Sequence, residues 1–155
     1  MIRFSANLGF LWTDRPLPDA IRAAKSAGFH AVECHWPYDT PVAEVKAALA
    51  DTGLEMLGLN TRRGDVARGD NGLSAIPGRE SEALSAIDEA IGYAVKIGAR
   101  NIHVMAGYDN SIAGGHVFID NLVYACEQGA GHDITILIEP LNEHDAPGYY
   151  LRTTQ

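Results

Sequence analysis

One carboxylate stands out in the sequence because of the residues that precede it. Glu139 follows an apolar run at residues 134–138 that has the composition of a buried strand. A glutamate at the end of such a strand lies at the mouth of a sheet, partly removed from water. There it can bind a metal ion, or accept and return a proton with a raised pKa. A helix cap or a partner for an arginine explains the position equally well.

Two asparagines end further predicted strands. Asn7 and Asn60 stand at the ends of residues 2–7 and 54–60. We expect both side chains to line a pocket, although capping of the following loops explains them equally well.

Histidines lie near these strand ends without the spacing of a zinc site. Alternation along residues 30–34 places Glu33 and His35 on one face, so we interpret this cluster as structural. His103 lies inside a predicted strand, where it either faces the substrate or belongs to the core. We favour the core interpretation.

The longest predicted loop, residues 61–78, is rich in glycine and contains Arg62, Arg63 and Arg68. One of these arginines could bind a carboxylate or close a lid. A solvated loop is the favoured interpretation.

Strands and helices alternate regularly along the chain. Gly28, Gly53 and Gly98 each end a predicted helix shortly before an apolar strand. The predicted strands are residues 2–7, 30–34, 54–60, 101–106 and 134–139, and the predicted helices are residues 16–27, 41–51, 79–97 and 117–128. Apolar strands separated by helices predict a parallel sheet buried on both faces.

This pattern fits an open α/β sheet or an α/β barrel. An open sheet usually has a glycine-rich phosphate-binding turn after its first strand, and residues 8–12 have no such turn. Polar residues instead collect at the carboxyl ends of strands, which is the rule for barrels.

Composition excludes several classes of protein. The 155 residues carry 12 Lys and Arg against 20 Asp and Glu, a net charge of −8 that disfavours binding to nucleic acids and to anionic membranes. No apolar run reaches the roughly 18–20 residues of a membrane helix, and the N-terminus does not resemble a signal peptide. With two cysteines, the chain fits a soluble cytoplasmic protein.

Several motifs together resemble the hydroxypyruvate isomerases, which belong to the sugar isomerase/epimerase superfamily with xylose-isomerase-like barrels. The likeness covers essentially the whole chain. It is carried by residues 3–8, 32–33, 36–39, 64–65 and 76–80, and most specifically by residues 139–149, which read EPLNEHDAPGY.

The resemblance implies an α/β fold, a (β/α)8 TIM barrel whose first five β/α units are present, in a single domain over residues 1–155. It also implies a divalent-metal aldose–ketose isomerase that acts on a small 2-oxo or 2-hydroxy acid, with Mg²⁺ or Mn²⁺ as the metal. Glu139 then binds the metal and moves a proton, and Asp145 matches a position that hydrogen-bonds substrate oxygens. As an exposed loop residue, Asp145 could instead only shape a turn.

A complete barrel of this type takes roughly 250 residues. The remaining ligands of the family site come from strands six to eight, so we expect this chain to be the N-terminal part of a longer enzyme and to be inactive alone. Its unpaired sheet edges favour self-association into a homo-oligomer.

Other functions stay open at this point. A 2-oxo-tetronate isomerase explains the motifs almost as well as a hydroxypyruvate isomerase, because the motifs do not reveal how many carbons the substrate has. An endonuclease-IV-like enzyme would need several histidines at strand ends and a basic groove, which the chain lacks. The chain could also be a non-catalytic interaction module.

Overall fold

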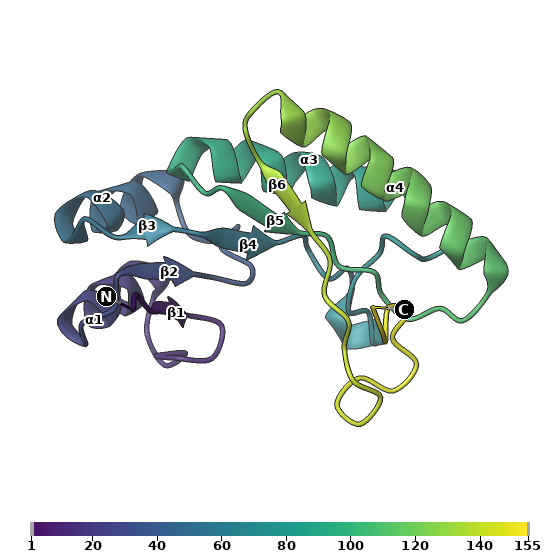
Figure 1. The fold of residues 1–155 in the computed structure, drawn as a ribbon, viewed down its shortest axis with the longest axis horizontal. Coiled ribbons are helices and arrows are strands. Elements are labelled where there is room, and N and C mark those ends of the chain that lie inside the picture. The colour runs from purple at the N-terminus through teal and green to yellow at the C-terminus, as the bar shows by residue number, and fades with distance from the viewer. Residues whose placement is uncertain (1, 155) are drawn as a thin grey trace.

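The computed structural model describes residues 2–154, in which parallel strands alternate with helices (Figure 1). The strands are β1 (Ser5–Asn7), β2 (Ala31–Glu33), β3 (Glu55–Met56), β4 (Gly58–Asn60), β5 (Asn101–His103) and β6 (Thr135–Leu137). The helices are α1 (Leu17–Ser26), α2 (Val42–Thr52), α3 (Glu80–Ile97) and α4 (Ile112–Ala130), with a 3-10 turn, η1 (Val66–Arg68), in the long loop. The predicted order of strands and helices is confirmed.

The third predicted strand is divided into β3 and β4 at Leu57. β3 completes a parallel sheet of order β1-β2-β3, and β4 begins a second one of order β4-β5-β6. Three further hydrogen bonds join the sheets, from Leu57 N to Val32 O at 2.7 Å, from Cys34 N to Gly58 O at 3.1 Å and from Asn60 N to His35 O at 2.8 Å. The strands therefore form one continuous layer, in which β4 pairs with β5 on one side and stays bonded to the end of β2 on the other.

The pairing of β4 with β5 has a local cause. A Cβ atom at Gly58 would lie 3.1 Å from the carbonyl oxygen of Asn101, so glycine lets β4 approach β5 closely. The side chain of Asn101 donates a hydrogen bond of 2.5 Å to the carbonyl oxygen of Leu57. This bond satisfies the backbone at the point where the two sheets meet.

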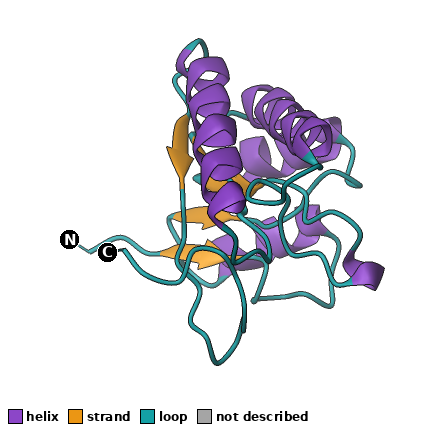
Figure 2. Cartoon of the chain, turned by 90° about the vertical axis from the view of Figure 1, so that its right-hand side faces the viewer, coloured by secondary structure: helices purple, strands orange, loops and turns teal. Residues whose placement is uncertain are grey.

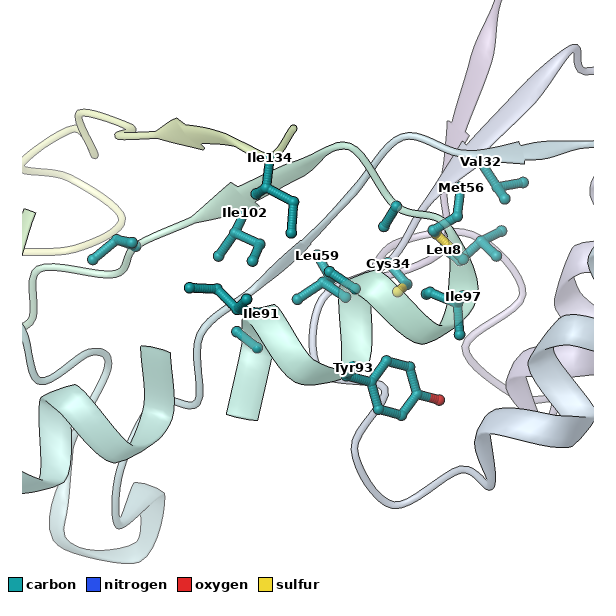
Figure 3. Packing of buried hydrophobic residues seen from close by; sticks show 14 of the residues in the cluster. Leu8, Val32, Cys34, Met56, Leu59, Ile91, Tyr93, Ile97, Ile102 and Ile134 are labelled. Carbon is teal, nitrogen blue, oxygen red and sulfur yellow. The ribbon is translucent and has the colours of Figure 1, made fainter. Parts of the chain in front are cut away.

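The hydrophobic core lies between the strands and the helices, which follow one side of the curved layer (Figures 1 and 2). Leu59 and Ile102 from the strands pack in one cluster with Ile91 and Ile97 of α3 (Figure 3). All four side chains are buried. The opposite face of the strands is left for the site described below.

Helix α4 begins five residues before the predicted start at residue 117. Ser111 caps it by accepting a hydrogen bond from Gly114 N at 3.0 Å, and this cap outweighs the poor helix propensity of two glycines. A Cβ atom at Gly114 would lie 1.9 Å from the Asp109 carboxylate, so the glycine is needed for packing.

Residues 140–154 contain no helix or strand and return to the carboxyl end of β5. The buried Tyr149 accepts a hydrogen bond from Ala106 N at 2.9 Å, and Tyr150 N donates to Gly107 O at 2.8 Å. Within residues 2–154, no helix combines the length and the apolar character that crossing a membrane requires.

The loop of residues 61–78 docks on the segment after β5 through two glycines in close backbone contact. A Cβ atom at Gly72, where φ is +122°, would lie 2.6 Å from Gly107 N. Gly72→Ala should therefore lower the free energy of unfolding by about 1–3 kcal/mol, combining backbone strain with the clash.

Gly92→Ala is the matched control, because Gly92 lies in α3 with open space around a Cβ atom. This substitution should raise stability by roughly 0.5–1 kcal/mol. Urea denaturation of both variants measures the difference. Equal stability of the Gly72 variant and the wild type would contradict the proposed docking of the loop.

Candidate functional site

A cavity of about 630 Å³ lies on the strand face away from the core. Side chains from β1, β2, β4 and β5 and from the segment after β6 line it, as parallel strands that share one carboxyl edge require. The polar side chains among its lining residues are Asn7, Glu33, His35, Trp36, Asn60, Asn71, Asn101, His103 and Glu139.

Glu139 lies two residues beyond β6, at the edge of this cavity. Its side chain is 63% exposed, and its Oε2 lies 3.6 Å from Nδ1 of His103. This carboxylate is therefore only partly shielded from water by the described residues. Glu139 can accept a proton at the cavity and exchange it with water.

His103 is the buried neighbour of this carboxylate. Burial, and to a smaller extent the charge of His35, lowers the pKa of His103 to about 4. The imidazole is therefore neutral near pH 7, and its contact with Glu139 is not an ion pair at that pH. Its Nε2 is buried without a hydrogen-bond partner among the described residues. A neutral imidazole with a free nitrogen beside a carboxylate suits the binding of a polar ligand.

Three charged residues around the cavity act on the pKa of His35. Burial lowers its pKa, the carboxylates of Glu33 and Glu139 raise it, and the charge of Arg63 lowers it. The ring packs against the backbone of Gly9, where a Cβ atom would come within 2.2 Å of it. Two negative charges and one positive charge therefore act on His35. They come from β2, from the segment after β6 and from the loop of residues 61–78.

The structure brings Asn7 and Asn60 to the cavity, together with Glu139. The side chain of Asn7 also caps the following turn, because its Oδ1 accepts a hydrogen bond from Gly9 N at 2.9 Å. The interpretation as pocket lining and the interpretation as a cap therefore both apply to Asn7.

Asp145 lies apart from the residues that line the cavity. Its carboxylate accepts a hydrogen bond of 2.6 Å from Asn142 Nδ2, and its backbone N–H donates to Asn142 Oδ1 at 2.9 Å. These contacts stabilise the turn of residues 142–145. A role for Asp145 in substrate binding stays a prediction.

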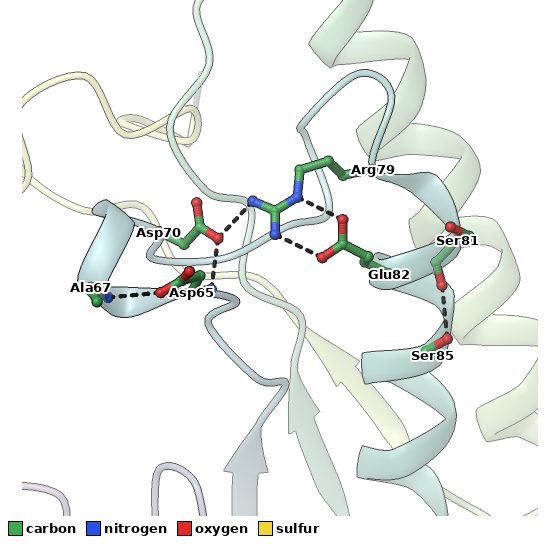
Figure 4. Close-up of polar contacts among 7 residues, drawn as sticks. All are labelled: Asp65, Ala67, Asp70, Arg79, Ser81, Glu82 and Ser85. Atoms are coloured by element: carbon green, nitrogen blue, oxygen red, sulfur yellow. Dashed lines mark hydrogen bonds and ion pairs between the residues drawn. The ribbon is translucent and has the colours of Figure 1, made fainter.

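The loop of residues 61–78 is held rigidly beside the cavity (Figure 4). Arg79 at the start of α3 contacts Asp70 at 2.6 Å and Glu82 at 2.8 Å, and Asp70 also accepts a hydrogen bond from Asp65 N. The next residue, Asn71, reaches the cavity. Asn71 does not stand out in the sequence, because an Asn-Gly pair in a loop usually indicates only a turn.

The described residues do not complete a site for a divalent metal. Within residues 2–154, no group of three or more His, Cys, Asp or Glu side chains is placed to hold an ion. Mg²⁺ and Mn²⁺ prefer several oxygen ligands, and Glu139 supplies one carboxylate toward such a set.

The low pKa of His103 predicts a dependence of stability on pH. Its folded-state pKa of about 4 lies below the value near 6.5 expected for an unfolded chain. The unfolded state then binds more protons between these values, so this contribution is present above pH 6.5 and is lost as the pH falls toward 4.

Urea denaturation of the wild type and of His103→Asn between pH 4 and 7.5 measures this contribution. The variant should lose less stability than the wild type across this range. His132→Asn, which replaces an exposed imidazole after α4, is the control and should follow the wild type. Parallel curves for His103→Asn and the wild type would contradict the neutral, buried state of His103.

Comparison with known proteins gives this site a family context. Over 155 aligned residues the chain is 40% identical to a 2-oxo-tetronate isomerase of Cupriavidus necator, an alignment covering 97% of this chain and 60% of that protein. It is 36% identical over 159 residues to a hydroxypyruvate isomerase of Escherichia coli, of which 62% is covered. The chain thus spans about three fifths of the length of these relatives.

A solved structure supports the same relationship. A crystal structure from Brucella melitensis, described as an AP endonuclease of family 2, superposes with a TM-score of 0.92 at 37% identity, over 97% of this chain and 60% of that chain. The family model named xylose isomerase-like TIM barrel matches residues 21–155. The strand order, the placement of the helices and this match agree with the predicted barrel type, and the described strands do not close on themselves. The chain belongs to the xylose isomerase-like TIM barrel family.

Proposed function

We propose that the natural protein is an aldose–ketose isomerase that interconverts hydroxypyruvate and tartronate semialdehyde. The observation that carries the proposal is the placement of Glu139 at a cavity edge beside the neutral imidazole of His103. Relatives at 36–40% identity that are named isomerases support the reaction class.

The proposed reaction moves one proton between neighbouring carbons. Glu139 takes the proton from C3 of hydroxypyruvate, and the electrons of that C–H bond form a C2=C3 double bond while O2 becomes negatively charged. A proton is then delivered to C2, and the O3 proton is transferred to O2, which gives the aldehyde at C3 and the hydroxyl group at C2. The reaction therefore needs a carboxylate at the cavity and neighbouring groups that tolerate a transient enediolate.

Asn7 and Asn60 are proposed to contact the substrate, since both line the cavity together with Glu139. Their amide groups can donate hydrogen bonds to substrate oxygens without adding charge. The unpartnered nitrogen of His103 offers a further hydrogen-bonding site in the same cavity.

A divalent metal, Mg²⁺ or Mn²⁺, is part of the proposal for the whole protein. Glu139 is the residue of this chain that would bind it, with the other ligands outside the described residues. A bound metal would polarise the substrate carbonyl and stabilise negative charge on oxygen.

A 2-oxo-tetronate isomerase is the second candidate. Its support is the name of the Cupriavidus necator relative, which is 40% identical. An extra carbon in the substrate leaves the proton transfer at Glu139 unchanged. Turnover of hydroxypyruvate and of 2-oxo-tetronate by the same preparation distinguishes the two.

The Brucella melitensis structure is named an AP endonuclease, which suggests an activity on nucleic acid as an alternative. The net charge of −8 opposes binding to a phosphate backbone. We therefore propose a small-molecule substrate rather than nucleic acid.

Replacement of Glu139 tests the proposed mechanism. Glu139→Gln in the natural protein should lower kcat for hydroxypyruvate by about 10²–10⁴-fold, because the amide cannot accept the proton. The melting temperature should stay near that of the wild type, because this side chain is largely exposed.

Glu143→Gln is the matched control, because Glu143 is an exposed glutamate of the same segment that contacts Arg152 and lies outside the cavity. Its turnover should equal that of the wild type. A Glu139→Gln variant with normal turnover would contradict the proposed role of Glu139.

Removal of metal tests the proposed cofactor. Chelation should abolish turnover, and added Mn²⁺ should restore it. Calorimetric titration should show Mn²⁺ binding at least about 10-fold weaker to Glu139→Gln than to the wild type, since the loss of even outer-shell partners has an effect of this size. Equal Mn²⁺ affinity of the two proteins, or full activity after chelation, would exclude this role for the metal.

A further inference from the structure

The arginines near the cavity differ in the contacts that they make. Arg62 lies 2.6 Å from Glu89 and 3.5 Å from Asp39, and Arg79 holds Asp70 and Glu82. Both guanidinium groups are therefore already paired with carboxylates of the protein. Arg63 has no carboxylate within ion-pair distance among residues 2–154. Its charge is therefore available to a ligand.

Arg63 lies against a wall of the cavity. Its Cζ is 3.9 Å from the centroid of the Trp36 ring, and Trp36 lines the cavity together with His35. The charge of Arg63 also contributes to the lowered pKa of His35, after the larger effect of burial. The electric field of this guanidinium thus reaches a side chain inside the cavity.

The stacked arrangement leaves the hydrogen-bond donors of Arg63 free. Stacking on an aromatic ring uses the face of the guanidinium plane, whereas its five N–H groups point outward in that plane. A planar guanidinium of this kind binds a carboxylate through two parallel hydrogen bonds.

The backbone of Arg63 is held in place. Its carbonyl oxygen accepts a hydrogen bond from Gly72 N at 2.9 Å, which joins it to the residue after Asn71. The ion pair between Asp70 and Arg79 also stabilises this loop (Figure 4). A loop ordered in advance loses less conformational entropy when a ligand binds.

The acidic lining of the cavity disfavours an anionic ligand unless a cation lies nearby. Glu33 and Glu139 are the acidic residues that line it, and its lining residues within 2–154 include no arginine or lysine. An anionic substrate entering there would meet two carboxylates. A cation on the wall offsets this repulsion and fixes the orientation of the substrate.

We propose that Arg63, stacked on Trp36 and free of carboxylate partners, binds the carboxylate of the substrate. The inference rests on the proposed function for the identity of the ligand, a short 2-oxo or 2-hydroxy acid. A carboxylate held by Arg63 beside Trp36 would direct C2 and C3 toward the cavity, whose lining includes Trp36 and Glu139. Arg63 thereby selects acids over neutral sugars of the same length.

Binding of glycerate, a 2-hydroxy acid without a carbonyl group, tests this role separately from catalysis. Calorimetric titration of the natural protein should show glycerate binding at least ~10-fold weaker to Arg63→Met than to the wild type. Methionine keeps a long apolar side chain over Trp36 and removes the charge. Arg63→Lys should give an affinity between the two, because it keeps the charge and loses the paired donors.

Arg68→Met is the matched control, because Arg68 is an exposed arginine of the same loop outside the cavity. It removes the same charge and should bind glycerate like the wild type. In steady-state kinetics, KM for hydroxypyruvate should rise from the wild type through Arg63→Lys to Arg63→Met. The value of kcat should change less than KM.

The outcomes separate this inference from the proposed function. Wild-type affinity for glycerate in either Arg63 variant, an equal loss in Arg68→Met, or no glycerate binding by the wild type would overturn the inference. Glycerate binding that depends on Arg63, in a wild type that turns over neither hydroxypyruvate nor 2-oxo-tetronate, would support the inference and refute the proposed function.

Discussion

The whole arrangement depends on the hydrogen bonding of residues 55–60. This segment pairs with β2 through β3, and beyond Leu57 it keeps hydrogen bonds to Cys34 and His35 while β4 pairs with β5 on its other side. Because every pairing in the layer is parallel, all carboxyl ends lie at one edge. Asn7, Asn60 and Glu139 are far apart in the sequence, and this one constraint brings them to the same cavity.

The depth of each titratable group in the structure decides its contact with water and, for His103, its charge near pH 7. His103 lies within β5 and is buried, so it is neutral near pH 7, whereas Glu139 lies beyond β6 and stays exposed to water. In the proposed mechanism, this exposure would let Glu139 exchange its proton with solvent. The loop of residues 61–78 carries the positive charge of Arg63 beside Trp36. Close contact of Gly72 with the segment after β5, and the ion pair between Asp70 and Arg79, hold this loop in place.

Much of this architecture could be predicted from the sequence, because periodicity and glycine caps report local structure directly. The strand ends at Asn7 and Asn60 follow from the alternation of apolar runs and glycines. The division at Leu57 could not be predicted, since it depends on the close approach of Gly58 to Asn101. The place of Asn71 at the cavity and the difference between Arg62 and Arg63 likewise come from tertiary contacts. Propensity alone also missed the first turn of α4, which a serine cap stabilises.

The central claim is that a solvent-exposed carboxylate, Glu139, carries the proton between the two carbons. The most direct test is proton NMR of the products formed from hydroxypyruvate in D₂O at early times by the natural protein. Because Glu139 is 63% exposed, its proton should exchange with the solvent during each turnover, so deuterium should appear at C2 of tartronate semialdehyde. A product that retains the original hydrogen at C2 would indicate direct hydride transfer between the carbons and would contradict the account.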